Sequence, residues 1–173
     1  MSVQVGQKAP GFKMQGIFKN EIRDIHLEDY AGKWAVLFFY PGDFTFVCPT
    51  EVTEFSEKND DFAELDAQVL GVSVDSVYAH KAWIRDLGEL RYPLLSDITK
   101  AVSRDYGVLI EDKGISLRGA FIIDPEGMLR YLVVHDLNIG RSVDEILRVL
   151  KALQTGEMCP VEWRPGKATL GKA

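Results

Sequence analysis

The sequence predicts an α/β fold with a central mixed sheet flanked by helices and an extended carboxy-terminal tail. Three observations lead to this expectation: apolar runs alternate with helical periodicity, two early runs enclose a helix, and two later runs flank a turn sequence. A chain of 173 residues with 46% hydrophobic content is long enough to bury one core. We therefore expect a single domain over residues 1–173, with residues 156–173 as its tail.

The first half of the chain contains a predicted βαβ unit. Residues 34–40 (WAVLFFY) and 67–74 (AQVLGVSV) are unbroken apolar runs, which is typical of strands buried on both faces. The apolar residues between them, after Pro49, fall on one face of a helix. They are Val52, Phe55, Phe62 and Leu65. The crossover between the two parallel strands should be right-handed.

Two helices and a hairpin are predicted next. One helix begins near Ser76 and ends at Gly88, where glycine suits the stop. Its buried face should carry His80, Trp83, Ile84 and Leu87. A shorter helix covers residues 99–106. The runs GAFIID and LRYLVV flank residues 124–127 (DPEG), whose order suits a type I turn, so the two runs should pair as a hairpin.

The last predicted helix begins with a capping box formed by Ser142 and Glu145. Its buried face should carry Val143, Ile146, Leu147 and Leu150. A βαβ unit followed by a hairpin and a final helix is the layout of the thioredoxin-like fold. Beyond Thr155 glycine and proline interrupt the chain repeatedly, so Cys159 should lie on an extended, movable segment.

Composition excludes several classes of function. The net charge of −6 disfavours nucleic acid and anionic membrane surfaces, which select basic partners. No run approaches the roughly 18 apolar residues of a membrane span, and the first residues lack the apolar core of a signal peptide, so we expect a cytoplasmic protein. Two cysteines are too few for a secreted disulfide scaffold, so they carry reactivity or nothing.

Cys48 lies where the first predicted strand gives way to a helix, with Pro49 suited to the first helical position. The N–H groups of a helix start favour the nucleophilic thiolate, but they supply only about 0.3–1 kcal/mol, whereas lowering the pKa of a thiol by two units takes about 2.7 kcal/mol. Glu51 and Glu54 oppose the thiolate through like charge, so a reactive Cys48 needs a nearby cation. Arg118 is the candidate, because it begins the later strand RGAFIID.

A cytosolic cysteine is often only an inert buried thiol. Here, however, the string YPGDFTFVCPTE resembles the peroxiredoxin active-site signature, with Pro41, Thr45 and Cys48 in its P-x-x-x-T-x-x-C positions. The resemblance continues through GVSVDS, HKAW, YPLLSD, RGAFIIDPEG, IGRSVDEILR and GEMCPVEWRPG, and so covers nearly the entire chain. It is strongest to bacterial alkyl hydroperoxide reductase C-subunits and other typical two-cysteine peroxiredoxins.

This resemblance implies a thiol-dependent peroxidase that reduces hydrogen peroxide and organic hydroperoxides. Cys48 would form a sulfenic acid, and Cys159 of the partner subunit would resolve it as a disulfide. Thr45 would orient the peroxide, and Arg118 would stabilise the thiolate and the leaving oxygen. The family pattern further implies a homodimer, a ring of dimers, a thiol or disulfide reductase as electron donor, and no cofactor.

Two more residues have a role by the same resemblance, Pro41 in shutting out water and Glu51 in positioning arginines. Each proposed site residue also has an ordinary structural interpretation. Thr45 suits a turn, Arg118 a solvated strand end, Pro41 the end of a strand, and Glu51 the first turn of a helix. Without the motif at Cys48, Cys159 would be an exposed thiol of no function.

Three functions other than peroxide scavenging can be compared with the sequence. A metal site could use Cys48, Cys159, His26, His80 and His135, but none of these has C-x-x-C or H-x-x-x-H spacing, and His80 is expected in the core. A thioredoxin-type disulfide reductase is disfavoured because Cys48 is followed by PTE. A ring-forming holdase or peroxide-signalling relay remains compatible with the sequence.

Resistance to excess peroxide is a further implication of the resemblance. Family members that are inactivated carry a GGLG loop and a terminal YF motif, which hold the peroxidatic turn folded. Here the loop reads DLGELRYPLL and no YF follows Cys159. We therefore expect disulfide formation to outcompete a second oxidation of the sulfenic acid.

Overall fold

The computed structural model describes residues 3–173, which divide into two compact units. The first unit ends at Arg141 and contains the sheet, and the second is Ser142–Ala173. The expected single domain over residues 1–173 stays a prediction.

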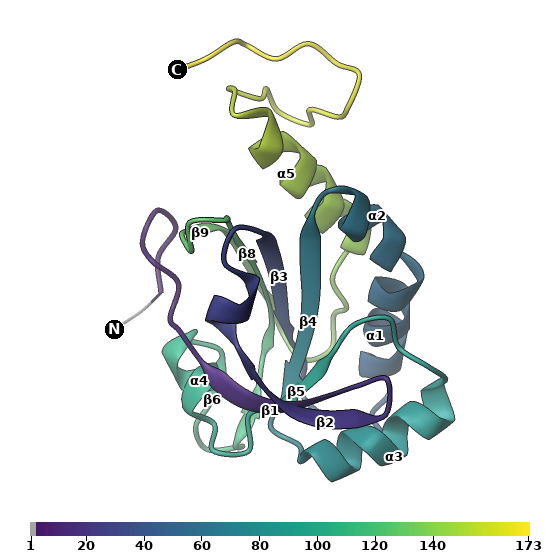
Figure 1. The fold of residues 1–173 in the computed structure, drawn as a ribbon. Coiled ribbons are helices and arrows are strands. Elements are labelled where there is room, and N and C mark those ends of the chain that lie inside the picture. Colours follow the sequence, from purple (N-terminus) through teal and green to yellow (C-terminus); the bar gives the residue numbers. More distant parts are fainter. Residues whose placement is uncertain (1–2) are drawn as a thin grey trace. The chain divides into compact units, whose positions relative to one another are not determined.

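The first unit is built on a seven-stranded mixed sheet with the order β2-β1-β5-β4-β3-β8-β9 (Figure 1). Its strands are β1 (Lys13–Phe18), β2 (Glu21–His26), β3 (Trp34–Phe39), β4 (Ala67–Ser73), β5 (Leu94–Ser96), β8 (Arg118–Ile123) and β9 (Leu129–His135). β3 runs parallel to β4 and antiparallel to β8, and β8 and β9 form the predicted hairpin. The mixed sheet and the βαβ unit are therefore confirmed.

Helices connect these strands. They are η1 (Leu27–Tyr30), α1 (Cys48–Glu57), α2 (Asn59–Glu64), α3 (Val77–Leu87) and α4 (Ala101–Asp105), and a small ribbon pairs β6 (Leu109–Ile110) with β7 (Ile115–Ser116). α3 begins as predicted, because the Ser76 hydroxyl accepts a hydrogen bond from the Ala79 N–H at 3.2 Å. It ends at Gly88, whose φ of 93° requires glycine.

The structure corrects two expectations and, within residues 3–173, adds five strands. The single helix expected after Pro49 is broken at Lys58, and the acidic Asp60 and Asp61 suit the first turn of the new helix α2. Pro49 occupies the second helical position, because α1 already begins at Cys48. The unpredicted strands are β1, β2, β5, β6 and β7. β1 and β2 form a hairpin through two residues with positive φ, Lys19 and Asn20, a turn signal weaker than Asn-Gly.

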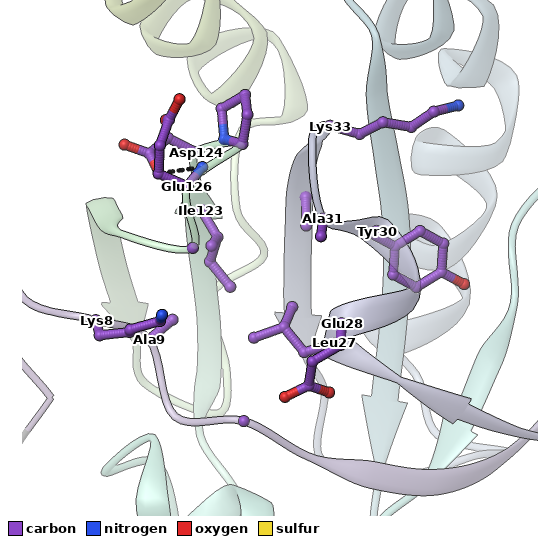
Figure 2. A pocket seen from close by; sticks show the side chains of 14 residues that line it. Lys8, Ala9, Leu27, Glu28, Tyr30, Ala31, Lys33, Ile123, Asp124 and Glu126 are labelled. Carbon is purple, nitrogen blue, oxygen red and sulfur yellow. Dashed lines mark hydrogen bonds between the residues drawn. The ribbon is translucent and has the colours of Figure 1, made fainter.

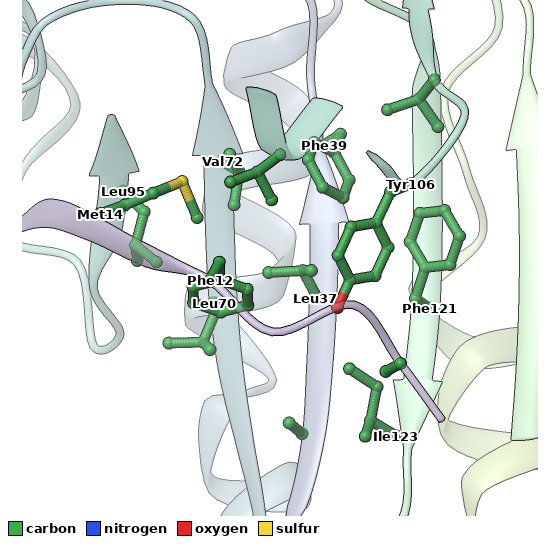
Figure 3. Packing of buried hydrophobic residues seen from close by; sticks show 14 of the residues in the cluster. Phe12, Met14, Leu37, Phe39, Leu70, Val72, Leu95, Tyr106, Phe121 and Ile123 are labelled. Carbon is green, nitrogen blue, oxygen red and sulfur yellow. The ribbon is translucent and has the colours of Figure 1, made fainter. Parts of the chain in front are cut away.

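The core occupies both faces of the sheet because β3 is apolar throughout and every residue of β4 except Gln68 is buried. One face carries a cluster in which the rings of Phe39, Tyr106 and Phe121 meet with centroids 4.9–5.7 Å apart (Figure 3). On the other face the ring of Phe38 stacks on Phe55 of α1 at 4.2 Å. These contacts fix α1 against the strand that leads into it.

His80 is part of the core, as predicted. It is fully buried on α3, and its Nδ1 lies 2.7 Å from the Asp43 carboxylate. Its Nε2 lies 3.0 Å from the Leu95 carbonyl. The same carboxylate accepts a hydrogen bond from the Tyr40 hydroxyl at 2.8 Å. This buried network holds the loop after β3 in place.

The second unit contains α5 (Val143–Thr155) and the tail. Only half of the predicted capping box forms: the Ser142 hydroxyl accepts from the Glu145 N–H, whereas the Glu145 carboxylate pairs with Arg148 at 2.6 Å. In the tail, the Trp163 ring nitrogen donates to the Lys167 carbonyl, and the Trp163 side chain is buried. In the part of the chain that the structure describes, no helix is long and apolar enough to cross a membrane.

Gly71 provides a test of the packing between α1 and the sheet. A Cβ there would lie 2.8 Å from both Leu94 Cδ2 and Phe38 Cζ, so Gly71→Ala should lower the free energy of unfolding by about 1–3 kcal/mol. Chemical denaturation measures this. Gly11→Ala is the control, because its Cβ would meet only the Glu28 carboxylate at 3.1 Å. Equal stability of the two variants would contradict the expectation.

Candidate active site

Cys48 is the first residue of α1, and its side chain is 0% exposed. It follows a loop that begins where β3 ends at Phe39. Because the sulfur sits at a helix start, it lies near backbone N–H groups that have no partner within the helix. The predicted junction between strand and helix is therefore confirmed.

Arg118 brings a positive charge to this sulfur. β8 is antiparallel to β3 with Ala120 opposite Phe38, so Arg118 lies two residues further on, beside the loop that leads to Cys48. Its Nη1 donates to the Cys48 Sγ at 3.3 Å, and its Nε donates to the Leu137 carbonyl at 2.8 Å. The Arg118 side chain is buried, not solvated, so the cation that the sequence required is present.

Glu51 holds two arginines, as the resemblance implied for it. Its Oε1 accepts from Arg118 Nη1 at 2.5 Å and from Arg141 Nη2 at 3.0 Å. Its Oε2 accepts from the Nε and the backbone N–H of Arg141, each at 2.7 Å. Arg141 also donates to the carbonyls of Phe39 and Gly119. Arg141 lies in the segment IGRSVDEILR, one of those that carry the family resemblance, and this segment is its sequence signal.

Burial and charge act in opposite directions on this cluster. Burial raises the pKa of the Glu51 carboxyl, but the hydrogen bonds and charge of Arg141 and the charge of Arg118 outweigh it, so the pKa lies below its ordinary value. Burial lowers the pKa of the Arg141 guanidinium, although Glu51 opposes the shift. Two cations and one anion leave one excess positive charge beside Cys48, which a thiolate would balance.

This charge count changes the interpretation of the acidic first turn. Glu51 is neutralised by two arginines, and Glu54 pairs with Lys58 at 2.8 Å. The carboxylates that were expected to oppose a thiolate are therefore both compensated. Glu51 in addition fixes Arg118 and Arg141 in place.

Thr45 and Pro41 lie in the loop before Cys48. The Thr45 side chain is exposed, and its hydroxyl donates to the Gly42 carbonyl at 2.9 Å, which is the ordinary turn contact. Pro41 is buried at the end of β3. Their roles toward a peroxide stay predictions.

Cys159 lies in the second unit and is a free thiol, like Cys48. It is half-buried, with its Sγ 3.6 Å from the Thr155 hydroxyl and 3.8 Å from the Ala152 carbonyl. It lines a shallow cavity of about 460 Å³ between the end of α5 and the tail. Access to the sulfur therefore needs no rearrangement of a large core.

A separate pocket of about 390 Å³ lies at the other end of β3, beside Ala35 and Ile123 (Figure 2). Figure 2 shows Lys8 on one side of it and Glu28 and Tyr30 on the other. It contains no cysteine or histidine. Within residues 3–173 no three His, Cys, Asp or Glu side chains are grouped as metal ligands would be.

Residues 5–132 match the profile of the AhpC/TSA family. The chain belongs to this family. A mitochondrial thioredoxin-dependent peroxide reductase of Drosophila melanogaster is 52% identical, over 95% of this chain and 74% of the relative. The reduced two-cysteine peroxiredoxin of Plasmodium vivax superposes with a TM-score of 0.93 at 44% identity, over 95% of this chain and 91% of that chain. Mycobacterium tuberculosis AhpC gives 0.85 at 40% identity, over 95% and 100%.

These matches confirm the thioredoxin-like fold and the resemblance to typical two-cysteine peroxiredoxins of the AhpC type. The protein is therefore an enzyme, a thiol-dependent peroxidase, with peroxides as substrates and thiol reductants as donors.

Replacing Glu51 by glutamine tests the charge cluster. Glu51→Gln should lower the free energy of unfolding at neutral pH by about 3–5 kcal/mol, because two buried guanidinium groups lose their shared anion. The native pKa of Glu51 lies below 4.5, so its stabilisation is present above that value and is lost as the pH falls through the lowered native pKa. The variant should therefore lose less stability than the wild type on acidification.

Chemical denaturation at several pH values measures both effects. Glu54→Gln is the matched control on the same helix, because the Glu54–Lys58 pair is partly exposed and should contribute at most about 0.5 kcal/mol. Similar losses of unfolding free energy in the two variants would show that the buried cluster stabilises the fold no more than the exposed pair does.

Proposed function

We propose that Cys48 is the peroxidatic nucleophile and that Cys159 of a second subunit resolves it. The observation that carries this assignment is the contact between Arg118 Nη1 and the Cys48 sulfur in a buried, net positive cluster. The thiolate attacks the terminal peroxide oxygen, an S–O bond forms as the O–O bond breaks, and the alcohol or water leaves after protonation. The resulting sulfenic acid condenses with the Cys159 thiol, forming the disulfide and releasing water.

The remaining site residues act on the substrate. The hydroxyl of Thr45 turns from its Gly42 contact to accept a hydrogen bond from the peroxide and to orient it. Arg118 stabilises the negative charge that develops on the leaving oxygen. Pro41 keeps water away from the thiolate. Each of these roles requires only a small movement of the loop before Cys48.

The second step requires opening of α1. A disulfide needs Cβ atoms about 3.5–4.5 Å apart, and a sulfur that is 0% exposed at a helix start cannot meet an outside tail without rearrangement. We therefore propose a two-fold homodimer in which each tail serves the other subunit, assembled further as a ring of dimers. The electron donor is a thioredoxin-type thiol or a disulfide reductase. A cytoplasmic location remains a prediction.

Serine substitution separates the two cysteines. Cys48→Ser should abolish peroxide reduction, whereas Cys159→Ser should consume about one equivalent of peroxide and then stall. Peroxide-treated wild type should migrate as a disulfide-linked dimer on a non-reducing gel. Steady turnover of Cys159→Ser with a thiol donor, or an oxidised band that remains monomeric, would overturn the resolving assignment.

Removal of the Arg118 charge tests the activation of Cys48. Arg118→Met should reduce the thiolate fraction at neutral pH and slow the reaction with peroxide about ten- to hundred-fold, because a charged hydrogen bond is typically worth about 1.5–3 kcal/mol. Thiolate ultraviolet absorbance and single-turnover kinetics measure the two quantities. Arg130→Met is the control, since Arg130 pairs with Asp124 on the same hairpin. An unchanged thiolate fraction would assign the charge effect to Arg141.

A further inference from the structure

We propose that Tyr92 is a positioning residue whose hydroxyl, bonded to the Val52 carbonyl, limits how far α1 unwinds during the catalytic cycle. The inference rests on the proposed function, because it concerns the opening that brings Cys48 to Cys159. Residues 91–92, which follow α3, would thereby influence how fast the disulfide forms.

Tyr92 is held rigidly against α1. Its side chain is 1% exposed, and its hydroxyl donates to the Val52 carbonyl at 2.6 Å. Its ring meets Phe38 edge-on at 5.6 Å, and Phe38 in turn stacks on Phe55 of α1. Burial raises the pKa of Tyr92 well above its ordinary value, so the hydroxyl stays a donor throughout the working pH range.

A second bond from the same segment holds the next turn of the helix. The Arg91 N–H donates to the Ser56 hydroxyl at 3.0 Å, and the Arg91 guanidinium pairs with Asp60 of α2 at 2.7 Å. Val52 and Ser56 are four residues apart and therefore lie on one face of α1. Residues 91–92 thus brace the helix from Val52 onward.

The turn before Val52 is held differently. The Thr50 hydroxyl donates to the Val47 carbonyl and the Thr53 hydroxyl to the Pro49 carbonyl, both within the same turn. Pro49 has no N–H to contribute. The contacts of residues 48–50 are therefore mostly local, whereas Glu51 is fastened to two arginines from other strands and loops.

The boundary at Val52 has a consequence for the charge cluster. If unwinding stops before Val52, Cys48 is released while Glu51 can stay paired with Arg141. Unwinding that continues past it would carry Glu51 away and leave two buried cations without their anion, which is costly. The bond from Tyr92 opposes that wider opening.

Loss of this bond adds the wider opening to the one that stops before Val52, so the open states together become more populated and the Cys48 sulfenic acid spends less time in the closed helix. Tyr92→Phe keeps the ring and removes the hydroxyl. It should leave the reaction of Cys48 with peroxide unchanged, speed disulfide formation about two- to ten-fold, and reduce sulfinic acid at a given peroxide dose. General loosening of the fold would instead slow the peroxide reaction as well.

Tyr106→Phe is the matched control. Tyr106 is also 1% exposed and also donates its hydroxyl to a backbone carbonyl, that of Pro10 at 2.8 Å, which lies outside α1. Rapid-mixing kinetics separate sulfenic acid formation from disulfide formation in both variants. Hydrogen exchange of the oxidised protein shows which part of α1 opens. In the wild type, only amides before Val52 should lose their protection. In Tyr92→Phe, the loss of protection should extend toward Glu57. Ser56→Ala should shift both readouts in the same direction.

Equal disulfide rates and equal exchange boundaries in Tyr92→Phe and Tyr106→Phe would overturn the inference. So would an unchanged exchange boundary in Tyr92→Phe when its disulfide rate rises, since the bond would then not limit the extent of unwinding. Failure of the proposed function has a different signature, because wild-type protein would then form no interchain disulfide with peroxide at all.

Discussion

The carboxylate of Glu51 accepts hydrogen bonds from both Arg118 and Arg141, and the geometry around Cys48 depends on this shared anion. Charges buried in protein are stable only when paired and hydrogen-bonded. The Glu51 carboxylate joins α1 to Arg118 at the start of β8 and to Arg141 at the end of the first unit. Because one carboxylate serves two guanidinium groups, the cluster keeps one positive charge uncompensated, and Cys48 is the side chain placed to use it.

The burial of Cys48 is at odds with the second half of the proposed cycle. Arg118 is fixed beside the buried sulfur and would balance a thiolate there, but a disulfide requires that sulfur to leave its place. The helix must therefore be stable before Val52 while peroxide reacts and must open there afterwards. Formation of the neutral sulfenic acid removes the thiolate charge and with it part of the attraction to Arg118, so oxidation itself weakens the closed state.

Local pattern was enough to predict the elements that carry the cysteine. β3, β4 and the hairpin of β8 and β9 appeared as unbroken apolar runs or as runs around a turn, and Arg118 followed from the start of one of them. β5 is only Leu94–Ser96, too short for periodicity to show, and β1 contains a glycine opposite Arg23 that weakens its strand pattern. Contacts between distant segments, such as Asp43 with His80, have no local signal at all.

The two arginines differ in how many of their donors are already used. Arg141 is nearly saturated, because its Nε, Nη1 and Nη2 donate to Glu51 and to two strand carbonyls. Arg118 uses Nε and Nη1, and its Nη2 has no acceptor among residues 3–173. A guanidinium has five N–H donors in a fixed plane. Arg118, which already contacts the sulfur, therefore still has N–H groups that can donate to a substrate oxygen. Arg141 therefore sets the position of Glu51 and of the end of β3, whereas Arg118 keeps a donor for the role that we propose for it.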